Sequence, residues 1–427
     1  MSPTRIALAL LLLASAVLPP LALAQEELRA DRKIETRPDV NHSMTEQVYK
    51  RLAAIHEKMG EDQLDEALAD LQRLSTARLN DYEEALVYQT FGFVYSQKNE
   101  ISKAIENFEK SLAMESLPGT AQQGMLYSLA SLYSAEGQYM KSIETAREWF
   151  RYEADPPADA YILIGAAFTE LERFDDALPY VLKGIDVSEE PKENWYMLAL
   201  AIRFQKEQFR EAIPMLKTML QLWPDRPRYW DMLAGCYLEI EDDQNALDTM
   251  MLAYENGAIE TEARLLGLVQ LNMLQDIPFT AGRILQAGMD NGLVAENRKN
   301  LDILLQAWLS AREYHRAIDV IERLTAFADD GSYLLQAAGI YSELGEWQAV
   351  ADSAVRALDA GLPRPNEALM LAGTAAVELG KFDEALTHFN RILASGDASA
   401  RANANSWIAF VEEKQQVRRA SLAARQE

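Results

Sequence analysis

Residues 88–108, YQTFGFVYSQKNEISKAIENF, contain two apolar patterns separated by a polar break. In residues 88–95, and again in residues 101–108, apolar or small side chains return at intervals of three and four, which places them on one face of an α-helix. The intervening residues 96–100 are polar and too few to form an element of their own. The segment therefore predicts two amphipathic helices joined by a tight turn.

Ala104 within this segment belongs to a series that recurs along the chain. Successive members are separated by 37, 38, 35, 35, 34, 35, 36, 33 and 35 residues, and each follows a polar turn and an aromatic or aliphatic residue. The series consists of Ala67, Ala104, Ser142, Ala177, Ala212, Ala246, Ala281, Ala317, Val350 and Ala385. A fixed period in the range of about 20 to 50 residues is typical of a stacked repeat architecture.

Small residues at these positions have a mechanical explanation. Where the two helices of a hairpin cross closely, a larger side chain would hold their axes apart. Prolines such as Pro118 and Pro224 fall near the ends of second helices, because a missing N–H and a fixed φ stop a helix. The whole pattern resembles the tetratricopeptide repeat (TPR) over residues 48–399. This resemblance implies an all-α fold, a TPR-type α-solenoid in which about ten helix hairpins form a right-handed superhelix with a C-terminal capping helix.

The sequence predicts four segments. Residues 1–24 are a signal peptide, residues 25–44 a flexible leader without helical periodicity, residues 45–399 the solenoid, and residues 400–427 a capping helix with a frayed tail. We expect the buried side of the capping helix to carry Trp407, Ile408, Phe410 and Val411. Because no glycine or serine tract interrupts the array, one continuous solenoid is favoured over two domains.

The signal-peptide prediction depends on three features. Arg5 precedes an apolar run over residues 6–18, and Ala22-Leu23-Ala24 forms an A-x-A-like cleavage site before Gln25. The run is too short to span a bilayer, and Pro19-Pro20 interrupts it. We therefore expect a mature chain that is secreted across the inner membrane and is not inserted in it.

The charge of the chain restricts its partners. It carries 41 Lys and Arg against 66 Asp and Glu, a net charge of −25 that is spread along the sequence. Such a field repels nucleic-acid phosphates and anionic lipid surfaces. We expect no nucleic-acid partner. In the simplest interpretation, this charge only keeps the surface of the protein soluble. In the functional interpretation, it attracts a basic protein partner.

No motif in the sequence indicates catalysis, and we expect no enzyme activity and no cofactor. The four histidines are far apart, and neither a metal-ligand spacing nor a phosphate-binding loop nor a nucleophile elbow is present. Once the repeats are assigned, no residues remain for a separate catalytic domain. Cys236 is the one cysteine, so no intrachain disulfide can form, and its position within a first helix indicates a small buried side chain.

Protein binding is the remaining function, and the concave face is its expected place. In tetratricopeptide arrays the first helices line this face, and the register of the repeats places an apolar track there. Methionine and aromatic side chains suit an adaptable peptide surface. The candidate peptide-binding residues are Gln89, Phe93, Tyr127, Ile162, Met197, Phe204, Asp231, Leu266, Met273, Leu335 and Met370.

A narrower resemblance suggests a biological setting. Residues 44–52 (MTEQVYKRL), residues 191–195 (PKENW) and residues 404–412 look like a bacterial family of periplasmic tetratricopeptide proteins, described as a component of the TonB energy-transduction system. The resemblance implies a non-enzymatic periplasmic scaffold that works with TonB, ExbB and ExbD in outer-membrane nutrient uptake. TonB-like or ExbD periplasmic regions would be its partners. The alternative is a scaffold for outer-membrane or cell-wall assembly complexes.

Overall fold

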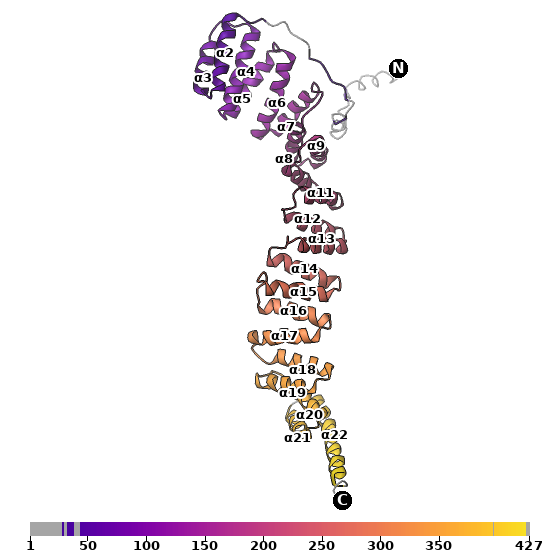
Figure 1. The fold of residues 1–427 in the computed structure, drawn as a ribbon. Coiled ribbons are helices and arrows are strands. Elements are labelled where there is room, and N and C mark those ends of the chain that lie inside the picture. Colours follow the sequence, from indigo (N-terminus) through magenta and orange to yellow (C-terminus); the bar gives the residue numbers. More distant parts are fainter. Residues whose placement is uncertain (1–27, 30–31, 38–42, 396, 424–427) are drawn as a thin grey trace, which may run out of the picture. The chain divides into compact units, whose positions relative to one another are not determined.

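A computed structural model describes residues 28–29, 32–37, 43–395 and 397–423 (Figure 1). The predicted signal peptide, residues 1–24, lies outside the described residues. Within them the chain forms twenty-one α-helices, one short 3₁₀ helix (η1, Thr325–Phe327) and no strand. The prediction of an all-α solenoid is confirmed.

The α-helices follow one another in pairs. Ten hairpins run from α2–α3 to α20–α21, and α22 follows as a single helix. The helices are α2 (Glu46–Gly60), α3 (Leu64–Ser75), α4 (Asp81–Gln97), α5 (Ile101–Ala113), α6 (Gly119–Ala135), α7 (Tyr139–Phe150), α8 (Ala158–Glu170), α9 (Phe174–Val187), α10 (Glu193–Gln205), α11 (Phe209–Leu222), α12 (Arg228–Glu239), α13 (Asp243–Glu255), α14 (Glu262–Leu274), α15 (Pro278–Asp290), α16 (Arg298–Ser310), α17 (Tyr314–Leu324), α18 (Ser332–Leu344), α19 (Trp347–Asp359), α20 (Asn366–Glu378), α21 (Phe382–Leu393) and α22 (Ala398–Ala423).

All ten hairpins use the same turn. A residue with positive φ lies one or two positions after the end of the first helix, and the residue that follows it donates its N–H to the carbonyl five positions earlier, at 2.8 to 3.0 Å. This hydrogen bond satisfies a carbonyl that the end of the helix would otherwise leave without a partner. The positive-φ residues are Asp62, Asn99, Gly137, Glu172, Glu207, Glu241, Asp276, Arg312, Gly345 and Gly380.

The small residue of each repeat follows five positions after the positive-φ residue. All ten members of the series, from Ala67 to Ala385, have an exposed fraction of 0 %. The first helix contributes a second close approach, because an added Cβ on Gly92 or Gly373 would lie 2.5 Å from the ring of Phe108 or Phe389, respectively. The prediction that small residues mark tight helix crossings is therefore confirmed, and the core lies between the paired helices.

The helices form two compact units, which are described separately. The first extends to Pro224 and contains α2 to α11, and the second starts at Asp225 and contains α12 to α22. A core that includes Trp149, Phe150 and Tyr180 lies in the first unit, and a core that includes Trp308 and Leu304 lies in the second. Within each unit, the repeats thus bury their apolar faces against one another, as a stacked array requires.

Helix α22 packs on the last hairpin through part of its surface. Val411 and Ala404 are fully buried beside Phe389 in a core shared with α20 and α21, and Trp407 stacks on Phe389 with ring centroids 5.8 Å apart. Phe410, by contrast, is 41 % exposed. Its predicted burial is wrong because six positions along the helix place Phe410 about 120° away from the buried Ala404.

Candidate functional site

The cavity best suited to a partner lies in the second unit, between the first helices α12 and α14. It has a volume of about 740 Å³, and α13 contributes Met250 to its wall. The lining residues are Asp231, Ala234, Gly235, Leu238, Met250, Arg264, Gly267, Gln270, Leu271, Met273 and Leu274. We call this surface the α12–α14 groove.

The groove exposes apolar side chains that the fold does not bury. Leu238 near the end of α12 is 41 % exposed, and Leu274 at the end of α14 is 65 % exposed. Met250 is only 7 % exposed and connects the groove with the core of the unit. Clustered exposed apolar side chains with a few polar groups are typical of a surface that binds another molecule.

Two glycines widen the groove without a packing reason. An added Cβ on Gly235 or Gly267 would meet no atom within 4 Å, whereas one on Gly92 would collide with Phe108. Glycine in a helix interior costs about 1 kcal/mol relative to alanine. Neither steric crowding nor a positive φ requires glycine at these two positions, and the missing side chains leave the surface between α12 and α14 open.

An ion pair forms the polar edge of the groove. Arg264 on α14 lies 2.5 Å from the carboxylate of Asp231 on α12, and their side chains are 25 % and 40 % exposed. The pair joins the first helices of two successive hairpins. It leaves the groove with an apolar wall and a polar edge whose two charges balance each other.

The eleven residues predicted for the concave face all lie on first helices, and none of them is buried. The structure brings two of them, Asp231 and Met273, together in the α12–α14 groove. The others are distributed along the array: Gln89 and Phe93 on α4, Tyr127 on α6, Ile162 on α8, Met197 and Phe204 on α10, Leu266 on α14, Leu335 on α18 and Met370 on α20. Sequence reasoning missed Gly235, Leu238, Gly267 and Leu274.

Part of the predicted track contributes to packing inside the first unit. Phe93 contacts Phe108 edge to face with ring centroids 5.0 Å apart, and Tyr127 lies 4.9 Å from Trp149. Phe204 lies 6.0 Å from Phe209 across its own hairpin. These aromatic pairs lie between the first and second helices of their hairpins.

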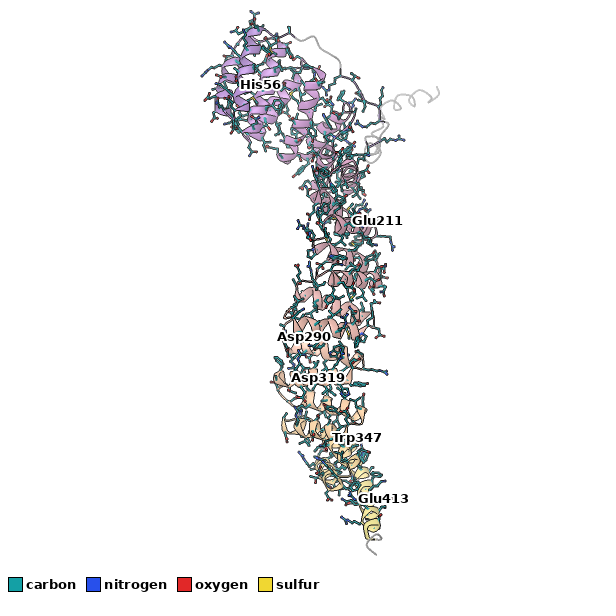
Figure 2. All side chains as sticks on the ribbon, in the orientation of Figure 1. His56, Glu211, Asp290, Asp319, Trp347 and Glu413 are labelled. Atoms are coloured by element: carbon teal, nitrogen blue, oxygen red, sulfur yellow. The ribbon has the colours of Figure 1, made fainter. Side chains whose placement is uncertain are left out.

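The described residues include no group of three or more His, Cys, Asp or Glu side chains placed to hold a metal ion. His56 lies on α2 (Figure 2), and its Nε2 is 3.3 Å from the hydroxyl oxygen of Thr90. Cys236 is buried with a free thiol, and burial is the main cause that raises its pKa to about 11. At neutral pH this thiol stays protonated, so it is a poor nucleophile.

In the residues that the structure describes, no helix is both long and apolar enough to cross a lipid bilayer.

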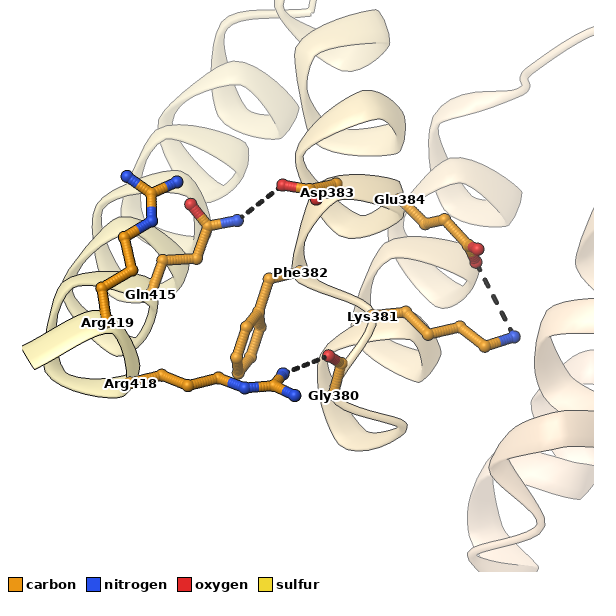
Figure 3. Close-up of a pocket in the computed structure, with 8 residues that line it drawn as sticks. All are labelled: Gly380, Lys381, Phe382, Asp383, Glu384, Gln415, Arg418 and Arg419. Atoms are coloured by element: carbon orange, nitrogen blue, oxygen red, sulfur yellow. Dashed lines mark hydrogen bonds and ion pairs between the residues drawn. The ribbon is translucent and has the colours of Figure 1, made fainter. Parts of the chain in front are cut away.

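A second cavity, of about 450 Å³, lies where α22 meets the turn before α21 (Figure 3). Gln415 donates a hydrogen bond to the Asp383 carboxylate at 2.8 Å, and Arg418 donates to the carbonyl of Gly380 at 3.2 Å. The Arg418 guanidinium also lies 5.8 Å from the centre of the Phe382 ring. These contacts attach the distal half of α22 to the last hairpin.

Two segments of the chain match family models described as "Tetratricopeptide repeat". One match covers residues 85–116, which contain most of the hairpin α4–α5, and the other covers residues 335–400, from α18 to the start of α22. The chain therefore contains tetratricopeptide repeats, a repeat type that indicates a protein–protein interaction scaffold. No curated protein sequence matches the chain.

Solved structures with similarity to the chain are also helical repeat proteins. A tetratricopeptide repeat protein from Parabacteroides merdae has 11 % identity and a TM-score of 0.37, with 62 % of this chain and 99 % of that chain covered. The C-terminal part of a TPR repeat-containing protein from Cytophaga hutchinsonii has 13 % identity and a TM-score of 0.39, with 64 % of this chain and 94 % of that chain covered. YrrB, a TPR protein described with an unusual peptide-binding site, has 17 % identity and a TM-score of 0.35, with 43 % of this chain and 90 % of that chain covered.

Proposed function

We propose that the protein is a non-enzymatic periplasmic scaffold, and that the α12–α14 groove binds a segment of a partner protein. The observation that carries this proposal is the pair of helical glycines, Gly235 and Gly267, between the exposed side chains of Leu238 and Leu274. A groove kept open at a cost in helix stability suits an apolar segment that enters it. The signal-peptide pattern of residues 1–24 supports the periplasmic part of this proposal.

The TonB energy-transduction system is the setting that we propose for this scaffold. The resemblance of residues 44–52, 191–195 and 404–412 to periplasmic tetratricopeptide proteins of that system supports it. The net charge of −25 suits a basic partner, and TonB-like proteins carry Pro-rich spacers with Lys–Pro runs. The partner would be the periplasmic part of a TonB-like protein or of ExbD, and the scaffold would support uptake of nutrients through the outer membrane.

Binding to purified partner fragments tests the proposal. In calorimetry, the mature chain should bind the periplasmic part of TonB or of ExbD from the same organism with micromolar affinity, about −8 kcal/mol. Raising the salt concentration should mainly slow association, because charge steers encounters more than it holds the complex. Absence of binding to both fragments at several hundred micromolar, with folded protein, would instead favour the envelope-assembly scaffold.

Matched variants locate the binding surface. Gly267→Phe fills the groove and should weaken binding at least about tenfold, which is about 1.4 kcal/mol. Gly124→Phe is the control, because Gly124 is also an exposed helical glycine with no atom within 4 Å of an added Cβ but does not line the groove. Equal affinities of the two variants would exclude the groove as the binding site.

A complementary pair of changes tests the apolar wall. The double variant Leu238→Gln/Leu274→Gln should also weaken binding. In the complex the partner would cover both leucine side chains, and the free energy gained by removing their apolar surface from water would be lost. Leu252→Gln on α13 changes a leucine of similar exposure, 50 %, outside the groove and should leave the affinity unchanged.

A further inference from the structure

Residues 32–37 of the leader lie against the edge of the first unit that α6 and α7 form. They have no secondary structure of their own, and Figure 1 shows them in indigo beside these two helices. The contacts join residues 85 to 121 positions apart in the sequence. Composition predicted a flexible leader, whereas these described residues make specific hydrogen bonds with the folded body.

The first contact uses the C-terminal end of α7. Arg32 donates one guanidinium N–H to the carbonyl of Phe150 and another to the carbonyl of Glu153. Phe150 is the last residue of α7, so its carbonyl lacks an intrahelical partner and lies at the negative end of the helix dipole. The guanidinium of Arg32 also lies 5.7 Å from the centre of the Phe150 ring.

The second contact surrounds another arginine. Arg37 donates to the side-chain oxygen of Gln122 and pairs with Glu148 at 2.6 Å, and its guanidinium lies 4.3 Å from the centre of the Tyr152 ring. Gln122 is 7 % exposed, and its amide nitrogen donates to the carbonyl of Leu117 at 2.7 Å. This second bond fixes the amide so that its oxygen is available to Arg37, whose side chain is 15 % exposed.

Between the two arginines, Glu35 contacts Arg151 twice. Its backbone N–H donates to the Arg151 carbonyl at 2.8 Å, and its carboxylate pairs with the Arg151 guanidinium, also at 2.8 Å. Gly119 gives the leader room, because an added Cβ there would lie 2.9 Å from the Cβ of Arg37. The edge therefore contacts an arginine, a glutamate and a second arginine at fixed spacings.

We propose that this edge of α6 and α7 is a binding site for an extended segment with the pattern Arg-x-x-Glu-x-Arg, and that the leader of the same chain occupies it. We call it the leader site. Its recognition chemistry is specific, since a planar guanidinium holds its N–H donors in a fixed fork that reaches two separate acceptors, whereas a lysine ammonium is a compact charge without that fixed geometry. Because the leader is tethered to α2, its effective concentration at the site is in the millimolar range, so an external segment binds only when the leader is displaced.

A labelled peptide tests the leader site directly. The peptide consists of residues 28–37, and fluorescence anisotropy measures its binding to the mature chain, residues 25–427. The variant Arg32→Ala/Arg37→Ala vacates the site and should bind the peptide at least tenfold more tightly than the wild-type protein does. A Lys33→Ala variant is the matched control, because Lys33 is exposed and belongs to the same segment, and it should behave like the wild type.

Two further measurements distinguish the site from a nonspecific surface. Adding Glu148→Ala to the double variant should weaken peptide binding at least fivefold, and a peptide with alanine at both arginine positions should not bind. Hydrogen exchange should show a protected Glu35 amide in the wild-type protein and a rapidly exchanging one in the double variant, because its acceptor is the Arg151 carbonyl.

Equal peptide affinity for the wild type and the double variant would overturn the proposal. Dimers that light scattering detects in the wild type but not in the double variant would place the leader in the site of a second copy and overturn the assignment to the same chain. The first unit supplies every contact of the leader site, so failure of the groove experiments leaves this inference intact.

Discussion

At the scale of single residues, all ten hairpin turns have the same geometry, but the amino acid at their positive-φ position differs. Three of the ten turns have glycine at the positive-φ position, and seven have a residue with a side chain, such as Glu172 (φ 56°) and Glu207 (φ 53°). The left-handed conformation costs a residue with a Cβ about 1 to 2 kcal/mol, whereas glycine adopts it freely. The turns that lack glycine therefore hold strain that neighbouring packing offsets.

We predict that Glu172→Gly and Glu207→Gly each raise the free energy of unfolding by about 0.5 to 1 kcal/mol, because relief of strain exceeds the added freedom of the unfolded chain. Glu144→Gly is the control, since Glu144 is exposed in the interior of α7, where glycine should lower stability by a similar amount. Urea denaturation measures all three. Destabilisation by the two turn variants would contradict the strain argument.

The α12–α14 groove shows what the sequence could and could not reveal about single residues. The repeat register placed Asp231 and Met273 on the first-helix face, and both line the groove. It did not identify Leu238 or Gly267, because apolar periodicity marks the side that is buried and says little about which outward residues stay uncovered. A usable signal was present, since Gly267 is a helical glycine away from the close helix crossings.

At the scale of helices, the buried small residue fixes how close the two helices of a hairpin approach. Ala177 on α9 is fully buried, and an added Cβ on Gly165 of α8 would lie 2.5 Å from Val181. Little free space therefore remains between α8 and α9. The sequence predicted this contact because the steric requirement repeats in every hairpin.

We predict that Ala177→Arg lowers stability by more than about 2 kcal/mol, because it overpacks the crossing and buries a charge. Since repeats contact only their neighbours, hydrogen exchange should rise mainly in α8 and α9. Val187→Arg introduces the same side chain at an exposed position of α9 and should change stability by less than about 0.5 kcal/mol. Unchanged protection of α8 in the Ala177 variant would refute the assigned crossing.

The leader site could not be predicted at this scale. Its contacts join Arg32 and Arg37 to residues on α6 and α7 that are distant in the sequence, and they involve no apolar periodicity. Polar residues such as Glu148 look like ordinary surface residues until a second segment lies beside them. Local patterns specify helices and turns well, whereas a single extended segment on a helix edge has no repeat that would reveal it.

For the whole molecule, acidic charge is the dominant electrostatic feature. Ion pairs such as Lys98–Asp65 and Arg356–Glu322 link neighbouring repeats, but pairs that keep contact with water are individually weak. With 66 acidic against 41 basic residues, repulsion between the unpaired carboxylates opposes the compact state. The fold tolerates this repulsion because apolar burial between helices provides most of its stability.

We predict that the Tm at pH 7.5 rises by about 2 to 4 °C when sodium chloride increases from 10 to 200 mM, because salt screens this repulsion. The same addition near pH 5 should have a smaller effect, since the carboxylates there begin to be protonated. Calorimetric scans at both pH values provide the measurement. A Tm that falls with salt at pH 7.5 would show that attractive pairs outweigh the net charge.

The shared turn also determines where the chain can change length. The buried small residue always follows the positive-φ residue at the fifth position, so inserting one residue between them would rotate the small residue by about 100° around its helix and away from the crossing. The spacing between repeats nevertheless varies from 33 to 38 residues, and this variation lies in helix lengths and in the connections between hairpins. Connections such as residues 188–192 are therefore the natural places for the protein to gain or lose residues, and for an epitope or a fluorescent label to be inserted.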